Sequence, residues 1–467
     1  MLRTHNLGEI NEKLAGKKVN LCGWIDSIRY FKSMVFIVLR DRYGKVQCII
    51  PNSSKGFEDA KKLTLESSIK INGEVKSRPK GQENKKMGKQ GGVEVSVSEL
   101  EIFNLCPKMP FDLKAENTED IRLENRFLDL RTDRMQKNIF LRGKITSAVL
   151  EFFEKEDFVY IETPILGKST PEGARDFLVP SRKEKGKVYA LPQSPQIFKQ
   201  LSQVAGFDKY IQIARCFRDE DSRKDRQPEF TQIDIEMSFI EEKDIIDVTE
   251  RMLKHVFKKV LDKDIKTPFK RITYEEAMKK YGVDNPDLRK DKKDINEFAF
   301  CWVLDFPTFE YSKEDKRYKS VHHPFTAPLL GKKGKLDFNE KSKSKAYDIV
   351  LNGSEIGGGS IRIHDSEVQS KVFDILKISK AEAKSKFGFL LNALQFGAPP
   401  HGGIALGMDR LVQLMAGEEN IREVIAFPKN KEAKDLMMNS PSDIYKEQLD
   451  EVGLGFKKFN KNKKNNN

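Results

Sequence analysis

The first hundred residues alternate apolar and polar positions with a period of two, which is typical of strands with one buried face. Runs of this kind cover residues 19–29, 34–40, 45–50, 69–77 and 92–103. A helical stretch is expected between the third and fourth runs, over residues 57–66. The short turn Asp41-Arg42-Tyr43-Gly44 would join the second and third strands as a hairpin.

Five strands with a helix after the third are the element order of an OB-fold β-barrel, whose open face binds oligonucleotides. Arg29 and Phe36 lie on strands that would form this face. There an arginine can pair with phosphate and an aromatic ring can stack on a base. A core phenylalanine and a solvated arginine would produce the same pattern, so the strands alone leave this choice open.

The periodicity changes after residue 106, where the first domain, residues 1–106, is expected to end. Residues 107–122 are polar and contain proline, which indicates a linker. A second domain is expected over residues 123–455. The remaining residues, 456–467, are rich in Lys and Asn, and we expect them to be disordered.

The second domain opens with apolar residues at helical spacing, namely Met135, Ile139, Ile145, Val149 and Phe152. This spacing predicts an amphipathic helix, and a strand over residues 158–163 follows it and stops at Pro164. Further strands and helices alternate without equal βαβ units. The sequence therefore predicts an α+β fold, in which an antiparallel sheet is flanked by helices.

Composition adds limits on location and partners. At 467 residues the chain is long enough for two or three domains, and it has no apolar run long enough to span a bilayer and no secretory signal pattern. We therefore expect a cytoplasmic protein with no membrane partner. The five cysteines are far apart and form no Cys-x-x-Cys motif, which indicates reduced thiols. A formal charge of +13 favours polyanionic partners, although a generally basic protein composition in the source organism would give the same charge. The basic tail predicts a weak, nonspecific RNA contact.

Two predicted strands, residues 210–218 and 230–239, flank a highly charged loop. Each strand has one apolar face. By the period of two, a set of polar residues shares the opposite face, namely Arg218, Glu220, Gln232, Asp234 and Glu236. Polar groups would thus converge on one surface, although a solvated hairpin tip would carry a similar set of charges.

A strand over residues 401–407 turns directly into a predicted helix over residues 409–415, so Arg410 lies in a first helical turn. A cation there opposes the positive end of the helix dipole by roughly 0.3–1 kcal/mol and calls for a compensating anion. A bound phosphate would supply it. A salt bridge to Asp409 or Glu418 is the alternative.

These segments resemble the signature motifs of class II aminoacyl-tRNA synthetases. Motif 2 has its counterpart here in Phe217-Arg218-Asp219-Glu220 together with Arg226-Gln227-Pro228-Glu229-Phe230, which resemble it. Motif 3 is resembled by Gly407-Met408-Asp409-Arg410. The amphipathic helix and the strand ending at Pro164 resemble motif 1, the dimer element. Three motifs in the family's order behind an OB barrel indicate the subclass for aspartate, asparagine and lysine.

Within this subclass, four segments resemble bacterial aspartyl-tRNA synthetases: Thr170–Asp176, Pro192–Lys199, His322–Phe325 and Gly357–His364. One departure is large. After Asn285-Pro286-Asp287-Leu288-Arg289 that type usually inserts a whole domain, whereas here about ten residues lead to Phe300. Because the active-site motifs are intact, the missing insert affects accessory tRNA contacts rather than the chemistry.

The resemblance implies an aspartate-tRNA ligase, which uses L-aspartate and ATP to form aspartyl-adenylate and pyrophosphate, then transfers aspartate to the 3' end of tRNA(Asp). Arg218 and Arg410 would be catalytic, with Arg218 at the α-phosphate and Arg410 at the γ-phosphate. The other implied ATP-site residues are Asp219, Glu220, Gln227, Glu355, Gly407, Met408 and Asp409. Asp348 and Glu355 would hold Mg²⁺, although an acidic pair at a solvated sheet edge would look the same.

The resemblance also implies receptors for aspartate and for the anticodon. Arg362 and Lys199 would receive the side-chain carboxylate, and Arg218 the reacting one. Glu172 and Gln196 would receive the ammonium group, Asp234 would hold Lys199 and Gln196, and His322 or His323 would close the pocket. Lys199 could instead be an exposed helix lysine. The implied anticodon-reading residues are Arg29, Phe36, Gln47 and Glu94.

Several alternatives remain at this stage. A lysyl enzyme would need an acidic pocket in place of Arg362 and Lys199, and an asparaginyl enzyme lacks the segment over residues 170–176. A non-catalytic RNA-binding relative is a further alternative. The presence of Arg218, Glu220, Glu355 and Arg410 counts against it, because such a protein need not keep them. The sequence leaves open whether tRNA(Asn) is also charged. Motif 1 implies a homodimer.

Overall fold

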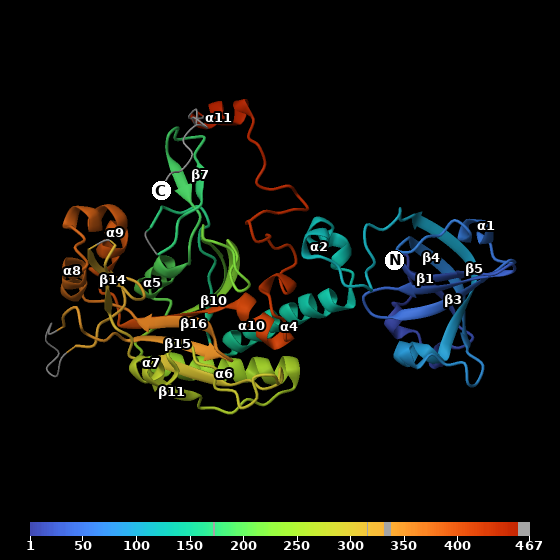
Figure 1. Cartoon of the computed structure of the whole chain (residues 1–467), viewed down its shortest axis with the longest axis horizontal. Helices are drawn as coiled ribbons and strands as arrows, with labels where there is room; N and C mark the ends of the chain where they lie inside the picture. The colour runs from blue at the N-terminus through green and yellow to red at the C-terminus, as the bar shows by residue number, and fades with distance from the viewer. Residues whose placement is uncertain (171–172, 315, 331–337, 456–467) are drawn as a thin grey trace. The chain divides into compact units, whose positions relative to one another are not determined.

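The computed structural model describes all residues except 171–172, 315, 331–337 and 456–467. The predicted tail and the expected ammonium ligand Glu172 therefore lie outside the described residues. Inter-residue contacts divide the chain into two compact units, residues 1–121 and residues 122–467 (Figure 1). Within the described residues, no helix is long and apolar enough to cross a bilayer. All five cysteines are free thiols.

The first unit is built on a closed barrel whose strands follow the order β1-β2-β3-β5-β4. Its elements are η1 (Leu7–Glu9), η2 (Glu12–Leu14), β1 (Lys18–Tyr30), β2 (Met34–Arg40), β3 (Lys45–Pro51), α1 (Phe57–Ala60), β4 (Ser68–Ser77), η3 (Lys85–Gly92) and β5 (Val93–Asn104). The five predicted strands are confirmed, with ends that differ by one residue at most. The barrel core is formed by the inward-facing residues of each strand, such as Val35, Ile37 and Leu39 of β2.

The helix expected over residues 57–66 is wrong in its length, because α1 ends at Ala60. Beyond it the Thr64 hydroxyl donates to the Cys106 carbonyl at 2.6 Å and lies 2.8 Å from the Ser67 hydroxyl. These side chains satisfy groups of the turn into β4, which a continuing helix would displace.

The second unit contains an eight-stranded sheet, among the described residues, in the order β11-β12-β15-β16-β17-β10-β9-β6. Its strands are β6 (Val159–Tyr160), β9 (Lys209–Phe217), β10 (Glu229–Ser238), β11 (Lys270–Thr273), β12 (Phe300–Leu304), β15 (Ala346–Leu351), β16 (Ser354–Ile361) and β17 (His401–Gly407). Two small hairpins accompany it, β7 (Leu178–Pro180) with β8 (Val188–Ala190), and β13 (Phe309–Ser312) with β14 (Arg317–Ser320).

The predicted antiparallel sheet is correct at the centre and wrong at both ends. β11 pairs with β12 in parallel, and so does β6 with β9. In each pair a long connection containing a helix joins the two strands, which permits parallel pairing. The expected strand over residues 158–163 shrinks to β6, Val159–Tyr160.

The helices of the second unit are α2 (Glu119–Glu124, which begins in the first unit), α3 (Arg126–Asp129), α4 (Asp133–Lys155), α5 (Gln196–Val204), α6 (Glu242–Leu261), α7 (Tyr274–Tyr281), α8 (Ser366–Ile375), α9 (Lys380–Leu394), α10 (Met408–Ala416), η4 (Ile421–Glu423) and α11 (Lys446–Val452). The predicted amphipathic helix is confirmed as α4, capped by the Thr132 hydroxyl, which accepts from the Met135 amide.

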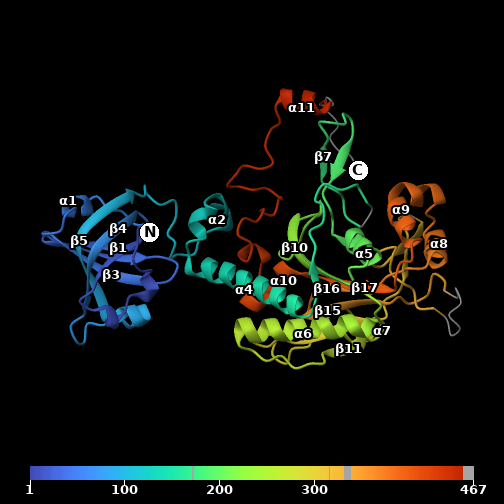
Figure 2. The same cartoon turned by 180° about the vertical axis from the view of Figure 1, so that it is seen from behind.

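The main hydrophobic core lies on one face of the sheet, where α4, α6 and α10 pack against it (Figure 2). Ile233 and Ile235 of β10 point into this core, as the period of two predicts. The opposite face is polar and is partly covered by α5, which packs on β9 and β10. The sheet therefore separates an apolar layer from a polar surface on which a site can form.

Candidate active site

The polar face of β10 organises the site. β10 lies between β9 and β17, with Asp234 opposite Gln212 of β9 and Ala405 of β17. Gln232, Asp234 and Glu236 are buried on this face, which confirms the predicted convergence of polar groups. Two features follow one another along this strand. A hollow lies at the Gln232 end of β10, and a buried cluster of charges lies at the Glu236 end.

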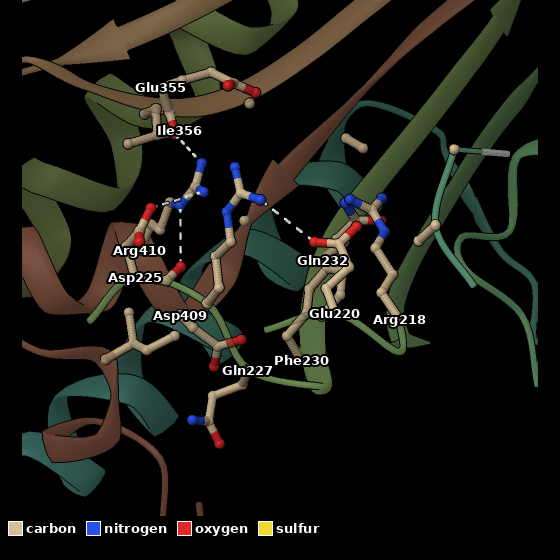
Figure 3. Close-up of a pocket in the computed structure, with 17 residues that line it drawn as sticks. Arg218, Glu220, Asp225, Gln227, Phe230, Gln232, Glu355, Ile356, Asp409 and Arg410 are labelled. Atoms are coloured by element: carbon tan, nitrogen blue, oxygen red, sulfur yellow. Dashed lines mark hydrogen bonds and ion pairs between the residues drawn. The ribbon is translucent and has the colours of Figure 1, made fainter. Parts of the chain in front are cut away.

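The hollow is a cavity of about 370 Å³ (Figure 3). Its lining comes from the β9–β10 loop, from β16 and β17, and from the start of α10, and it includes Arg218, Glu220, Asp225, Gln227, Phe230, Gln232, Glu355, Gly407, Asp409 and Arg410. Most of the residues that the sequence assigned to the ATP site thus line one cavity. Asp219 is exposed and does not line it, and Met408 is fully buried in the hydrophobic core.

Arg218 stands at the end of β9, on one side of this cavity. Its guanidinium carbon lies 5.0 Å from the centre of the Phe230 ring, and its Nε lies 3.4 Å from the Gln193 carbonyl oxygen. A cation over an aromatic face is held electrostatically and retains donors for an anion. Phe230 and Gln193 are not among the predicted site residues, although both lie inside segments with the family's motifs.

Arg410 extends into the cavity from the first turn of α10. Its Nη2 lies 3.1 Å from Asp225 Oδ2 and its Nη1 donates to the Glu355 carbonyl oxygen at 2.7 Å (Figure 3). The salt bridge to Asp409 or Glu418 considered as an alternative does not form: Asp409 pairs with Arg142, and Glu418 pairs with Arg134. The carboxylate that pairs with Arg410 is instead Asp225, a residue of the β9–β10 loop, and the bound phosphate expected there stays a prediction.

Two predicted ATP-site residues have their polar atoms bound within the protein. Asp409 Oδ1 accepts from Arg142 of α4 at 2.5 Å, and its Oδ2 accepts from the Thr231 amide at 2.9 Å. Gln227 exchanges two hydrogen bonds with the backbone of Lys429. Asp409 thus joins α10 to α4 and β10, which gives it a positioning role. Glu220 pairs only loosely with Arg226, at 3.4 Å.

Four charged side chains form a buried cluster, namely Lys199, Asp234, Glu236 and Arg362. Lys199 Nζ lies 2.9 Å from Asp234 Oδ1 and 3.5 Å from Glu236 Oε2. Since Lys199 is 1% exposed, the exposed-helix interpretation of this lysine is wrong. Buried charges persist only when they are paired, so these four side chains depend on one another for their buried positions.

Arg362 is held more tightly than the sequence indicated. Its Nε and Nη2 donate to the two carboxylate oxygens of Glu236 at 2.9 and 3.1 Å. Its Nη1 contacts Ser360 Oγ and His323 Nε2, each at 2.7 Å. The bidentate edge of Arg362, which was expected to bind a substrate carboxylate, is thus occupied by Glu236. The position of Glu236 on this face was predicted, but this role was not. Gly403 permits the approach, because a Cβ there would lie 2.1 Å from Glu236 Oε2.

The two carboxylates of this cluster lie in different electrostatic surroundings. Burial raises the pKa of Asp234 despite the opposing charge of Lys199. Burial also raises the pKa of Glu236, but the charges of Arg362 and Lys199 outweigh it, and the net pKa is lower than usual. Asp234 Oδ2 is buried and accepts no hydrogen bond from the described residues. It is therefore available as an acceptor, whereas Gln196 Nε2 donates to Gln200 and is not held by Asp234.

The two adjacent histidines take different positions. His323 contacts Arg362, and His322 lies 3.9 Å from Asp348. Burial, followed by the charge of Arg362, lowers the pKa of His322 to about 4 and that of His323 well below its usual value. Both rings are therefore neutral at pH 7, and only His323 belongs to the carboxylate cluster.

Asp348 of β15 and Glu355 of β16 converge on the bare backbone of Gly358, where a Cβ would lie 2.4 Å from Asp348 Oδ1 and 3.8 Å from Glu355 Oε1. Asp348 Oδ1 is buried without a hydrogen-bond partner among the described residues. Burial, followed by the charges of Glu355 and Asp284, raises the pKa of Asp348 well above its usual value. Two unneutralised carboxylates at one point fit a hard divalent cation.

The described part of the chain has no group of three or more His, Cys, Asp or Glu placed to bind a metal. A cation held by Asp348 and Glu355 alone would keep other positions for water and phosphate oxygens. This coordination is the one that Mg²⁺ prefers.

In the first unit, the four expected anticodon residues lie outside the barrel core. Arg29 of β1 is directly opposite Phe36 of β2, and Gln47 of β3 donates to Glu94 of β5 at 3.0 Å. Phe31 packs edge-on against Phe36, with ring centres 5.3 Å apart. The core interpretation of Phe36 is therefore wrong, because its ring lies outside the barrel core and is partly exposed.

A barrel of the oligonucleotide-binding type and a sheet that carries two cavity arginines are the features of a class II aminoacyl-tRNA synthetase. The family model described as tRNA synthetases class II (D, K and N) matches residues 118–431, and the OB-fold nucleic acid binding domain model matches residues 19–103. The chain belongs to the aspartate-tRNA ligase family of this class, as its relatives show.

Two relatives, each named aspartate-tRNA(Asp/Asn) ligase, cover nearly the whole chain. The Thermotoga neapolitana protein is 41% identical over 97% of this chain and 99% of its own length, and the Desulfatibacillum aliphaticivorans protein is 42% identical over 98% of each. The first alignment spans 577 positions although this chain has 467 residues. The relative therefore carries more than a hundred residues that are missing here, which confirms the absence of a large insertion.

Solved structures share the fold at low identity. The asparaginyl-tRNA synthetase of Pyrococcus horikoshii in complex with asparaginyl-adenylate has a TM-score of 0.75 at 24% identity, covering 92% of this chain and 98% of that one. The aspartyl-tRNA synthetase of Entamoeba histolytica has a TM-score of 0.72 at 24% identity, covering 92% of each chain.

Proposed function

We propose that this protein activates L-aspartate with ATP, forming aspartyl-adenylate and pyrophosphate, and transfers the aspartate to the 3' end of tRNA(Asp). One observation carries the proposal. The cavity with Arg218 and Arg410 and the buried cluster with Lys199 and Arg362 share the polar face of β10. A triphosphate in the first and an aspartate side chain in the second would bring the reacting carboxylate and the α-phosphorus together at Gln232.

Activation requires positioning and charge neutralisation rather than covalent help from the protein. Arg218 neutralises the α-phosphate and the reacting carboxylate, and Arg410 meets the γ-phosphate once it leaves Asp225. Asp348 and Glu355 would hold Mg²⁺, which when bound neutralises phosphate charge. Phe230 offers its second face to the adenine ring.

The buried cluster selects the amino acid. The substrate side-chain carboxylate is received by Lys199 Nζ and by Arg362 Nη1, which exchanges its contact with Ser360 Oγ or with neutral His323 for the substrate oxygen. The free Oδ2 of Asp234 accepts from the substrate ammonium group. An asparagine side chain would direct its amide donors at these cations, and such a mismatch of buried donors costs about 1–3 kcal/mol or more. In the transfer step the tRNA 3'-hydroxyl attacks the anhydride, and the adenylate phosphate accepts its proton.

The test is exchange of labelled pyrophosphate into ATP, measured separately with aspartate, asparagine and lysine. We expect exchange with aspartate only, and its loss in Arg218→Ala. Exchange with none of the three in folded, magnesium-supplied protein would favour a non-catalytic RNA-binding role. The two relatives are named for both tRNA(Asp) and tRNA(Asn), so charging of each tRNA by the same protein decides whether this chain is equally broad.

We also propose a homodimer formed through α4 and β6. β6 is the edge strand of the large sheet, and its residues Val159 and Tyr160 are 42% and 46% exposed. An exposed apolar edge strand favours pairing with another chain. Analytical ultracentrifugation would test this, since a monomer at micromolar concentration contradicts it. A cytoplasmic location, where tRNA is charged, stays a prediction.

A further inference from the structure

His323 has a hydrogen-bond donor on each side of its ring. The Phe325 amide donates to Nδ1 at 3.2 Å, and Arg362 Nη1 lies 2.7 Å from Nε2. A neutral imidazole carries a single ring proton, so one of its nitrogens donates and the other accepts. Only one of these two contacts can therefore be a hydrogen bond, and the position of the proton decides which one it is.

The peptide unit between Pro324 and Phe325 is fixed on its carbonyl side. The Pro324 carbonyl oxygen accepts from Gln369 Nε2 of α8 at 2.9 Å. The next carbonyl, that of Phe325, accepts from the Ile363 amide at 2.8 Å, and the Phe325 ring is buried. The N–H of this peptide unit is therefore held toward His323 Nδ1, which has to act as the acceptor.

Gln369 is 1% exposed, and the orientation of its amide follows from its partner. A carbonyl oxygen only accepts, so the Nε2 group of Gln369 faces Pro324. Gln369 Oε1 is then buried without a hydrogen-bond partner among the described residues. An unsatisfied buried oxygen lowers stability, and an apolar side chain would avoid this cost. The hydrogen bond to the Pro324 carbonyl is therefore what a glutamine contributes at this position.

Arg362 does not depend on His323 for an acceptor. Its Nη1 also lies 2.7 Å from Ser360 Oγ, and its Nε and Nη2 donate to Glu236. The proton of His323 can therefore stay on Nε2, where its N–H and the Arg362 Nη1 group are directed at the same space. Two donors that face one another repel, and an oxygen that accepts from both removes the repulsion.

We propose that Gln369 fixes His323 as the Nε2–H tautomer and thereby sets the preference of the pocket for aspartate over asparagine. The inference rests on the proposed function, in which Lys199 and Arg362 receive the side-chain carboxylate. With its proton on Nε2, His323 adds a further donor, and the amide group of asparagine finds no acceptor there. With the proton on Nδ1, Nε2 would accept from that amide and asparagine would fit. Gln369 acts through the peptide unit and His323, so it is a positioning residue.

The experiment compares Gln369→Met, which keeps the length of the side chain and removes its donor, with Val372→Thr as matched control. Val372 is buried on the same helix one turn further on, and it packs in a cluster that does not contain Phe325. In pyrophosphate exchange with Gln369→Met, we expect the KM for aspartate to rise about fivefold, as for the loss of one hydrogen bond. The ratio of kcat/KM for aspartate to kcat/KM for asparagine should fall about tenfold, with an unchanged KM for ATP. Val372→Thr should leave all three quantities unchanged.

The tautomer can be observed directly. The nitrogen NMR shifts of the imidazole rings are measured in protein labelled at histidine, and the spectrum of His323→Gln assigns the His323 signals. We expect the Nε2–H form in the wild type and a mixture of both tautomers in Gln369→Met. His323→Gln presents an amide donor that no tautomer can remove, so adding Gln369→Met to it should change the selectivity no further.

Four results would each overturn the proposal. They are an Nδ1–H tautomer in the wild type, an unchanged KM for aspartate and unchanged selectivity in Gln369→Met, an equal change in Val372→Thr, and additive effects in the double variant. Failure of the wild type to exchange pyrophosphate with aspartate would refute the proposed function instead, while the NMR measurement still tests the tautomer and its dependence on Gln369.

Discussion

Arg410 of α10 and Asp225 of the β9–β10 loop form an ion pair, with Nη2 and Oδ2 3.1 Å apart. Asp225 thus holds the guanidinium that would receive the ATP γ-phosphate, and ATP has to displace it. In Asp225→Asn we expect the KM for ATP in pyrophosphate exchange to fall about two- to fivefold, the range for a partly exposed ion pair worth up to about 1 kcal/mol. Asp221→Asn removes the same charge from the same loop and should leave the KM unchanged. A KM for ATP that rises in Asp225→Asn would show that Asp225 supports binding.

Glu236 stabilises the buried cluster. Glu236→Gln leaves Arg362 and Lys199 with less compensating charge, and breaking a buried pair costs about 3–5 kcal/mol of unfolding free energy. We expect a loss of this order in urea unfolding, together with a higher KM for aspartate. Glu229→Gln on the same strand, where Glu229 is half-buried beside Arg215 and Lys429, should cost less than about 1 kcal/mol. Equal losses in the two variants would contradict this role of Glu236.

Asp409 acts through Arg142 and the Thr231 amide, so its effect on catalysis should be shared with Arg142. Single variants Asp409→Asn and Arg142→Gln are each expected to lower kcat for pyrophosphate exchange. The double variant should be little worse than either single variant, with a coupling energy of about 1–3 kcal/mol in unfolding. Strictly additive effects on both rate and stability would show that Asp409 contacts ATP independently of Arg142.

The carboxylates of Asp348 and Glu355 repel one another in metal-free protein. In the presence of EDTA, Asp348→Asn is expected to raise the unfolding temperature, because one buried, unpaired charge is removed. Added Mg²⁺ should stabilise the wild type more than the variant, since a ligand that binds only the native state shifts the equilibrium. An identical response of both proteins to Mg²⁺ would exclude Asp348 as a ligand.

His323 is expected to remain neutral across the physiological range, because burial and then the charge of Arg362 lower its pKa well below 6.5. The unfolded chain binds this proton more readily, so the contribution of His323 to stability is present above pH 6.5 and is lost as the pH falls toward the folded pKa. The KM for aspartate should accordingly show no histidine titration between pH 6 and 8. An NMR titration that places the His323 pKa near 6.5 would contradict this.

The sequence by itself determined the elements and the layout of their faces. The strands of the barrel, the helix α4 and the polar face of β10 follow from local periodicity, because alternation and helical spacing depend only on neighbouring residues. The position of Glu236 beside Gln232 and Asp234 was visible in the same way, although its partner was not. The segments 217–230 and 407–410 indicated the class of enzyme before any geometry was known.

Only the tertiary structure decided which charges meet. Asp225 is 185 residues from Arg410 along the chain, and Arg142 is 267 residues from Asp409. No local pattern predicts such pairs, because they form when the strands and helices are brought together. The same reason applies to Arg362, whose carboxylate-binding edge is bound to Glu236. Burial then fixes the protonation of these groups, since a charge in the interior persists only where folding supplies its partner.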